Sequence, residues 1–226
     1  MLYTARSTKN QRKLGAANRE RGAVVQKRGD VVREGLISAC DRLLRLHPPS
    51  KITSGMLLKE ANVARGTLYH HFDSASAVVE KTLLESFSAH VDLNITALRQ
   101  LVDHSKTREE FAEGLRLVTR VSQSSDRRST RFARTRLIAY SEISSTLRKT
   151  LAKEQERLTV AIEEIVMAAK KKGWVKKSIK PRPAAVLIQA YTLGKIVDDV
   201  AETKMPEEDW NALIDEVVLG GMMTRD

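Results

Sequence analysis

The sequence contains a single cysteine, Cys40, among its 226 residues. One cysteine excludes an intrachain disulfide and a cysteine-rich metal site. Aromatic residues make up only 4% of the chain, which also has just 5 prolines and 11 glycines. Helix-forming residue types such as alanine, leucine, glutamate, lysine and arginine dominate instead. We therefore expect an all-α fold rather than a β-sandwich or barrel, with Cys40 as a small buried side chain.

Long apolar runs are also missing. No stretch approaches the roughly 20 apolar residues that a membrane-spanning helix needs. The basic residues near the N-terminus are not followed by the apolar segment of a secretory signal. We expect a cytoplasmic protein with no membrane partner.

Patterns typical of catalysis or metal binding are absent from the sequence as well. It has no paired nucleophile and base, no glycine loop that would cradle phosphates and no metal-ligand spacing. His70 and His71 are adjacent, so their side chains diverge around a helix and do not chelate one ion. We therefore expect neither an enzyme nor a cofactor nor a bound metal.

Positive charge is abundant. The formal net charge is +11, which attracts polyanions, and nucleic acid is the leading candidate. Residues 1–23 form a basic segment with little apolar periodicity, which predicts a mobile N-terminal arm. Two readings of this arm stay open: it reaches along DNA and adds phosphate contacts, or it is a solvated tail with no defined partner.

Residues 24–76 have the pattern of a small helical domain. An amphipathic helix begins near residue 24 and ends at His47-Pro48-Pro49. Thr53 or Ser54 can cap a short second helix over 56–61, and Asn62 tolerates the left-handed conformation of a tight turn. A third helix follows over 65–72.

Residues 77–226 have the pattern of a larger helical domain. A long fourth helix, capped by Asp73 or Ser74, begins near residue 75 and keeps one apolar face to about residue 102. Further helices are expected over 107–123, 127–141, 143–172, 182–203 and 206–221, with Gly173 ending the third of these, so that the chain has about nine helices.

The segment 53–72 carries the functional prediction. Its apolar residues are spaced to pack two short helices across a turn, as in a helix-turn-helix. The side chains left pointing outward on the second of these helices suit base edges and phosphates. They are Arg65, Thr67, Tyr69, His70 and His71.

The run Gly66-Thr67-Leu68-Tyr69-His70-His71-Phe72, between Ala61-Asn62-Val63 and Ser74, resembles the DNA-binding signature of the TetR family. The resemblance covers about residues 30–85. It implies a three-helix DNA-binding domain followed by a larger helical domain that binds an effector and dimerises. It also implies that Thr53 and Ser54 touch phosphate, that Arg65, Gly66 and Thr67 lie nearest base edges, that Tyr69 and His71 bind phosphates, and that His70 meets a thymine methyl group or the DNA backbone.

The chain departs from the family pattern at several positions. Asn62 stands where glycine is usual. Ala64 replaces the usual serine or threonine cap, which should weaken the start of the recognition helix by about 1 kcal/mol. Ala75 and Ser76 replace a Lys-Glu pair, so one lysine contact to phosphate is missing, and we expect the basic arm to compensate for it.

In the larger domain, the resemblance implies an effector pocket and a dimer interface. Inward-facing stripes with polar interruptions place the pocket at Phe87, His90, Val91, Asn94, Phe111, Leu115, Tyr140, Gln189 and Leu193. Apolar stripes on the last two helices place the interface at Leu187, Tyr191, Ile196, Trp210, Leu213, Ile214 and Val217. For both sets of residues, ordinary core packing is the open alternative.

A second basic cluster falls within residues 127–136. It has three open readings: a solvated face, a site for an acidic ligand, or an arginine buried with a carboxylate such as Glu142. The cluster consists of Arg127, Arg128, Arg131, Arg134 and Arg136.

The favoured function is an effector-responsive repressor that binds a palindromic operator in double-stranded DNA as a homodimer. The fourth helix would carry the effector's influence, because it begins in one domain and ends in the other. The alternative is an architectural protein that binds DNA with little specificity and has no effector. The ratio of specific to random-duplex affinity distinguishes the two.

Overall fold

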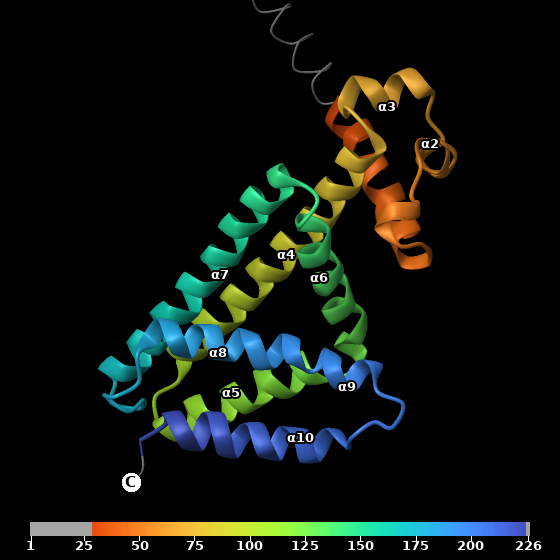
Figure 1. Cartoon of the computed structure of the whole chain (residues 1–226). Helices are drawn as coiled ribbons and strands as arrows, with labels where there is room; N and C mark the ends of the chain where they lie inside the picture. Colours follow the sequence, from red (N-terminus) through yellow and green to blue (C-terminus); the bar gives the residue numbers. More distant parts are fainter. Residues whose placement is uncertain (1–28, 225–226) are drawn as a thin grey trace, which may run out of the picture. The chain divides into compact units, whose positions relative to one another are not determined.

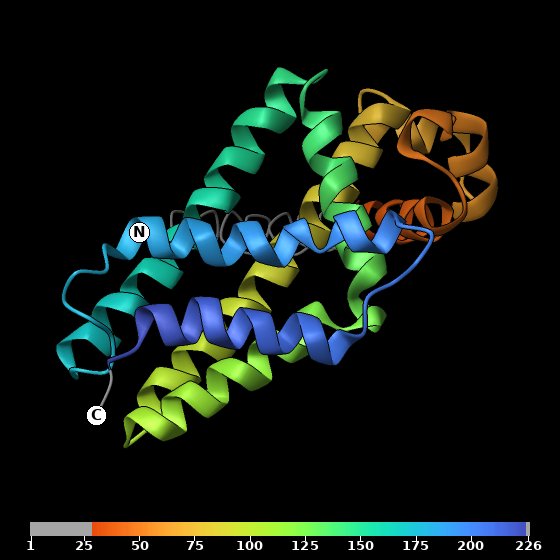
Figure 2. The same ribbon diagram turned by 60° about the horizontal axis from the view of Figure 1, so that its bottom comes forward.

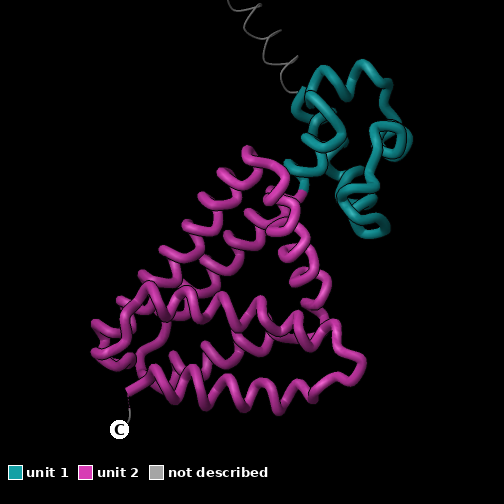
Figure 3. Tube along the Cα trace, viewed as in Figure 1, with its two compact units in different colours: residues 1–82 teal, residues 83–226 magenta. Residues whose placement is uncertain are grey.

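The computed structural model describes residues 29–224, and the N-terminal arm predicted at residues 1–23 lies outside them. Within the described residues the chain is helical apart from its connections and one isolated bridge between Val175 and Met223. The expected all-α fold is confirmed. The chain divides into two compact units, Met1–Thr82 and Leu83–Asp226, which are described separately (Figure 3).

The N-terminal unit is built from short helices around a small core. Residues 29–46 are helical and are followed by a 3-10 turn, Pro49–Lys51. The helices α2 (Ser54–Ala61) and α3 (Arg65–His71) come next, and the first turns of α4 (Ala75–His104) complete the unit. The core side chains with no exposed surface are Leu36, Ala39, Cys40, Leu57, Leu68 and Val78.

The C-terminal unit begins with the rest of α4 and contains the other helices (Figure 1). Helix α7 packs against α8, α6 packs against α7 and α9, and α5 packs against α8 and α10. Figure 2 shows α8, α9 and α10 running along the face that comes forward in that view. The helices are α5 (Arg108–Gln123), a 3-10 turn η2 (Ser125–Arg127), α6 (Arg128–Ser141), α7 (Ser145–Lys171), α8 (Pro181–Gly194), α9 (Ile196–Val200), α10 (Glu207–Ile214) and a π-helical continuation η3 (Asp215–Gly220).

Hydroxyl side chains fix where several helices begin. Ser74 accepts a hydrogen bond from the Ala77 amide at the start of α4, at 3.1 Å, and Thr107 and Ser144 cap α5 and α7 in the same way. Each bond satisfies an amide of the first turn that has no partner inside the helix. At the other end of α7, Gly173 takes a φ of +81°, so the predicted glycine stop is confirmed.

Two predicted helices differ from the structure. The helix expected over 182–203 is broken at Lys195 between α8 and α9. Gly194 lowers the helix propensity there, and the buried Lys195 ammonium pairs with the Asp198 carboxylate, three residues further along, at 2.9 Å. The helix expected over 206–221 changes from α to π geometry after Ile214. No helix within residues 29–224 has both the length and the apolar character needed to cross a membrane.

Candidate functional site

Helix α2 starts at a threonine cap. The Oγ1 of Thr53 accepts a hydrogen bond from the Met56 amide at 3.3 Å. Of the two candidate caps, Thr53 is therefore the one used, and a cap of this kind contributes about 1 kcal/mol to helix stability. The hydroxyl of Ser54 lies 3.3 Å from the hydroxyl of Tyr69, which links the first turn of α2 to α3.

The turn between α2 and α3 depends on Asn62. Its φ of 52° and ψ of 49° are left-handed, and within residues 29–224 no other residue except Gly173 has a positive φ. The prediction that Asn62 replaces the usual glycine by adopting this conformation is confirmed. Asparagine does so at lower cost than most side chains because its short amide can bond locally.

Helix α3 begins without a side-chain cap. Ala64 occupies the N-cap position in an extended conformation, and it has no hydroxyl or carboxylate to offer the first-turn amides. Only the backbone carbonyl of Ala64 is available, and it accepts from the Thr67 amide at 3.0 Å. The sequence expectation of a weakened helix start agrees with this geometry.

The inner faces of α2 and α3 hold the pair together. Leu57 and Leu68 have no exposed surface, and Phe72 is buried beneath the Arg33 guanidinium, which lies 5.4 Å from the ring centroid. Burial of such side chains supplies most of the stability of short helices, which are marginal in isolation. The orientation of α3 is therefore fixed by its apolar side.

The outer face of this helix pair carries the residues predicted to touch DNA. All of them keep exposed or partly exposed side chains or backbone: Thr53, Ser54, Arg65, Gly66, Thr67, Tyr69, His70 and His71. They come from the start of α2 and from the solvent side of α3.

Arg65 and Tyr69 are held next to each other on α3. The Arg65 guanidinium lies 5.7 Å from the centroid of the Tyr69 ring. The Ser54 hydroxyl and then Arg65 stabilise the phenolate form and lower the pKa of Tyr69 from its ordinary value. Contacts of this kind restrict the rotamers of both side chains, so less freedom is lost when they bind a ligand.

In the C-terminal unit, the residues predicted to line an effector pocket are spread over several environments. Phe87 and Val91 are buried, and Phe111 is a core residue that packs on Trp174 at a centroid distance of 5.3 Å. Gln189 is also buried, whereas His90 is half-buried. The others, Asn94, Leu115, Tyr140 and Leu193, are partly exposed.

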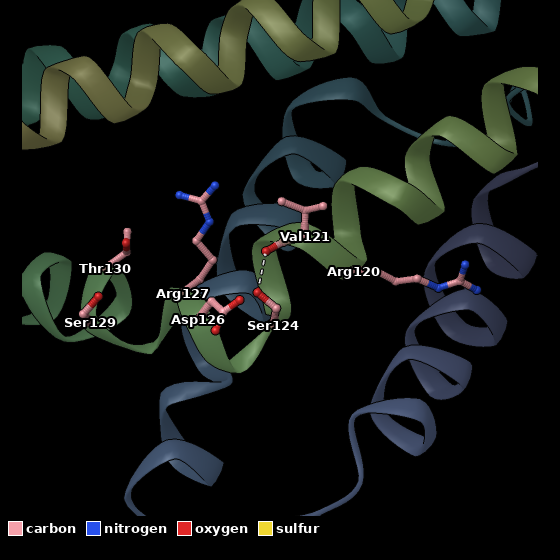
Figure 4. Close-up of a pocket in the computed structure, with 7 residues that line it drawn as sticks. All are labelled: Arg120, Val121, Ser124, Asp126, Arg127, Ser129 and Thr130. Carbon is pink, nitrogen blue, oxygen red and sulfur yellow. Dashed lines mark hydrogen bonds between the residues drawn. The ribbon is translucent and has the colours of Figure 1, made fainter.

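A pocket of about 690 Å³ lies beside η2 and is lined by different residues (Figure 4). In the close-up, the side chain of Arg127, which is exposed, projects away from η2, and Arg120 points toward another helix. None of the predicted pocket residues lines it. Its lining consists of Arg120, Val121, Ser124, Asp126, Arg127, Ser129 and Thr130.

The arginines of the basic cluster at residues 127–136 differ in whether they face the interior or the solvent. Arg131 is 4% exposed and forms a two-pronged ion pair with Asp199, with Nε to Oδ2 at 2.5 Å and Nη2 to Oδ1 at 2.8 Å. Glu142, the carboxylate suggested from the sequence, instead contacts Arg148 at 3.3 Å. Sequence reasoning missed Asp199, although two adjacent acids in an apolar helix, Asp198 and Asp199, were a usable signal.

The predicted dimer residues also differ in exposure. Ile214 is 6% exposed and packs in the core of its own unit. Leu187, Leu213 and Val217 are about half exposed or more, whereas Tyr191, Ile196 and Trp210 are partly buried. The Trp210 indole donates a hydrogen bond to Gln123 at 3.1 Å, which ties α10 to α5.

Further exposed apolar side chains extend the same surface. Val186, Val197 and Val200 are 52%, 73% and 65% exposed, and they fall on one helical stripe of α8 and α9. Their spacing of 11 and then 3 residues follows the helical period, so the sequence could have identified Val186 and Val200 together with Leu187. A stripe of this kind on a water-facing helix indicates a contact surface.

Comparison with known proteins identifies the N-terminal part of the chain. The family model for bacterial regulatory proteins of the tetR family matches residues 36–81, which include α2, α3 and the start of α4. No curated protein sequence matches the chain.

Solved structures with the same fold cover nearly the whole chain at low sequence identity. A protein from Mesorhizobium loti assigned to the TetR family of transcriptional regulators is 13% identical, with a TM-score of 0.66, over 87% of this chain and 99% of its own. E. coli NemR in its reduced form is 16% identical, with a TM-score of 0.65, over 86% and 99%. A protein from Saccharomonospora viridis, assigned as a transcriptional regulator and solved with choline, is 14% identical, with a TM-score of 0.67, over 87% and 100%.

Helix-turn-helix, fold and family model agree. Residues 36–81 therefore carry the helix-turn-helix domain of the tetR family of bacterial regulatory proteins, and the described chain shares the helical fold of solved structures assigned to that family.

Proposed function

We propose that this regulator is a homodimeric repressor that binds a palindromic operator and is released by a small effector. The observation that carries the proposal is the outer face of α3. Every outward side chain there can form hydrogen bonds, while the inner face is fixed by Leu57, Leu68 and Phe72. A rigid helix with that division suits insertion into the major groove.

Arg65 is the residue we propose for base recognition. It is the first residue of α3, and the N-terminal residues of a recognition helix meet base edges. Its guanidinium can donate to guanine O6 and N7 together, which is worth about 1 to 3 kcal/mol of discrimination. Thr53, Ser54, Tyr69 and His71 would bind phosphates around it and fix the register of the helix on the duplex.

The exposed apolar stripe of α8 and α9, together with Leu213 and Val217, supports dimerisation. Two copies that pack these helices against each other would cover the stripe in a four-helix arrangement with twofold symmetry. The same symmetry would place two α3 helices about 34 Å apart, in successive major grooves of a palindromic site.

A small-molecule effector is supported by a structural neighbour. The Saccharomonospora viridis protein of the same fold was solved in complex with choline. We propose that this chain also binds a small molecule in its C-terminal unit. The effector would favour a form of the dimer with lower operator affinity, because a ligand shifts an equilibrium only through its different affinities for the two forms.

Selection of bound sequences from a random duplex pool at about 150 mM salt tests DNA recognition. The same selection is run with Arg65→Ala and, as a matched control, with Arg45→Ala, an exposed arginine of the same unit outside α2 and α3. We expect wild type and Arg45→Ala to enrich one palindrome, and Arg65→Ala to lose preference at one symmetric pair of positions.

Two other outcomes would contradict the proposal. Salt-sensitive binding without an enriched sequence would indicate the architectural alternative, in which phosphate contacts supply all the affinity. An enriched palindrome that is equally sharp for Arg65→Ala would keep sequence-specific regulation but remove Arg65 from base recognition.

A further inference from the structure

Two inward-facing arginines of α6 have opposite surroundings. Arg131 has a full set of partners, because Asp199 takes its Nε and Nη2 while Nη1 donates to the Ser122 and Ser124 carbonyl oxygens. Arg134, one turn further along the same helix, has no carboxylate within ion-pair distance anywhere in residues 29–224. The charge of Arg131 is therefore neutralised within the fold, whereas that of Arg134 is not.

The guanidinium of Arg134 is incompletely satisfied. Its Nη2 donates to the Oε1 of Gln155 at 3.0 Å, and the guanidinium carbon lies 5.6 Å from the centroid of the Phe87 ring. Its Nε is buried and has no hydrogen-bond partner among the described residues. An arginine offers five N–H donors, and buried polar groups are rarely left unpaired without a reason.

The groups around Arg134 are fixed by a chain of side-chain hydrogen bonds. The amide of Gln155 donates to the Oε1 of Gln189. Gln189 in turn donates to the Thr159 hydroxyl at 3.0 Å and to the Ala185 carbonyl oxygen at 3.2 Å. This network holds the Gln155 carbonyl oxygen toward Arg134, and it gives Arg134 a neutral acceptor in place of a carboxylate.

More positive charge lies nearby. Burial, and then the charges of Arg127 and Arg134, lower the pKa of His90, so both arginines contribute positive potential at this position. Arg127 lines the pocket of about 690 Å³, and its guanidinium projects from η2 (Figure 4) without an ion-pair partner in the described chain. Among the lining residues only Asp126 is acidic, and it is exposed.

We propose that Arg134 binds the carboxylate of a small organic acid through its unused donors, while the nearby charge of Arg127 adds to the positive potential that attracts the acid. The inference rests on the proposed effector response and assigns the chemical class of the effector. A planar guanidinium matches a carboxylate in shape and charge. On the inward side of α6, Arg134 is the arginine that lacks a carboxylate, and it lies over the Phe87 ring, which suits a monoanion with an apolar body better than a doubly charged phosphate.

Ligand binding to the intact, DNA-free protein tests the proposal. Thermal shift and calorimetry compare a panel of acids, from acetate to decanoate together with benzoate and naphthoate, with the neutral amide of each. Phenyl phosphate is included beside benzoate to separate carboxylate from phosphate recognition. We expect at least one acid to bind more tightly than its amide and more tightly than the phosphate ester.

Variants locate the site. Arg134→Gln should weaken the best acid about thirtyfold or more, because one partner of a buried charged pair is lost. Arg136→Gln, which removes an exposed arginine of the same helix, should bind the acid as wild type does. Arg134→Met should fold with an unchanged or higher melting temperature without ligand, since a partly buried charge that has no counter-charge has been removed.

Several results would overturn the inference. Acids that bind no better than their amides, or phenyl phosphate that binds more tightly than benzoate, would contradict carboxylate recognition. A preference for acids that survives Arg134→Gln would remove Arg134 from the site. A large fall in the melting temperature of Arg134→Met would make the residue structural. Operator binding by wild type and Arg134→Gln is measured separately. If the wild-type protein binds an operator but no acid, this inference alone is refuted. If the wild-type protein binds no operator, the proposed function is refuted.

Discussion

The buried pair between Arg131 and Asp199 gives a sharp test of how the C-terminal unit is held together. Its side chains are 4% and 7% exposed, and the pair joins α6 to α9. Replacing Asp199 with asparagine would leave the Arg131 charge buried without a counter-charge. Removal of one partner from such a pair costs about 3 to 5 kcal/mol. For a chain of this length that corresponds to a fall of about 6 to 20 °C in melting temperature.

Two control variants separate the effect of burial on stability from the effect of the two-pronged geometry. Arg182 and Glu156 form an equally two-pronged pair, at 2.9 and 2.8 Å, but both side chains are about half exposed. Glu156→Gln should therefore change the unfolding transition by no more than the measurement error, because water screens exposed pairs. The double variant Arg131→Met/Asp199→Leu should lose less stability than Asp199→Asn, since no charge is left buried.

The same pair predicts a dependence on pH. The hydrogen bonds and charge of Arg131, partly opposed by burial, hold the pKa of Asp199 below its ordinary value. The stabilisation is therefore complete above the unfolded-state pKa, about 3.9, and is lost as the pH falls through the lower folded-state pKa. Urea unfolding at pH 7, 4 and 3 measures it. An Asp199→Asn variant as stable as wild type at pH 7, or a double variant that loses as much as the single one, would refute the reasoning.

Two further predictions concern the other functional surfaces. Ala64→Ser should stabilise the N-terminal unit by about 1 kcal/mol, because the extended backbone at the N-cap of α3 lets a serine hydroxyl accept from a first-turn amide; unchanged urea unfolding would contradict this. Leu213→Glu/Val217→Glu should convert the proposed dimer into monomers in sedimentation experiments, whereas Ile143→Glu, a substitution at a 78% exposed apolar residue elsewhere, should not; dimers that persist in the first variant would place the interface on another surface.

Local chemistry made the N-terminal unit predictable. The hydroxyl cap at Thr53, the left-handed Asn62 and the bare N-cap at Ala64 each depend on residues within four positions along the chain. Apolar periodicity then indicated which side of α3 is buried. The extent of the later helices was less accessible, because the break at Lys195 depends on a buried ammonium group that turns to Asp198, which propensity and periodicity do not describe.

The basic cluster shows that sequence patterns do not predict which partner a buried side chain meets, and the reason is physical. Arg131 and Arg134 are three residues apart and share the inward side of α6, so period and composition give them the same environment. The difference between their environments comes from groups that other helices contribute. Helix α9 supplies a carboxylate to the first arginine, and α7 supplies only the amide of Gln155 to the second. The buried Arg131 has its counter-anion within the fold, whereas the partly buried Arg134 has none and would be stabilised when an anion binds. That difference is why Arg131 belongs to the stability of the unit and Arg134 to its proposed response to a ligand.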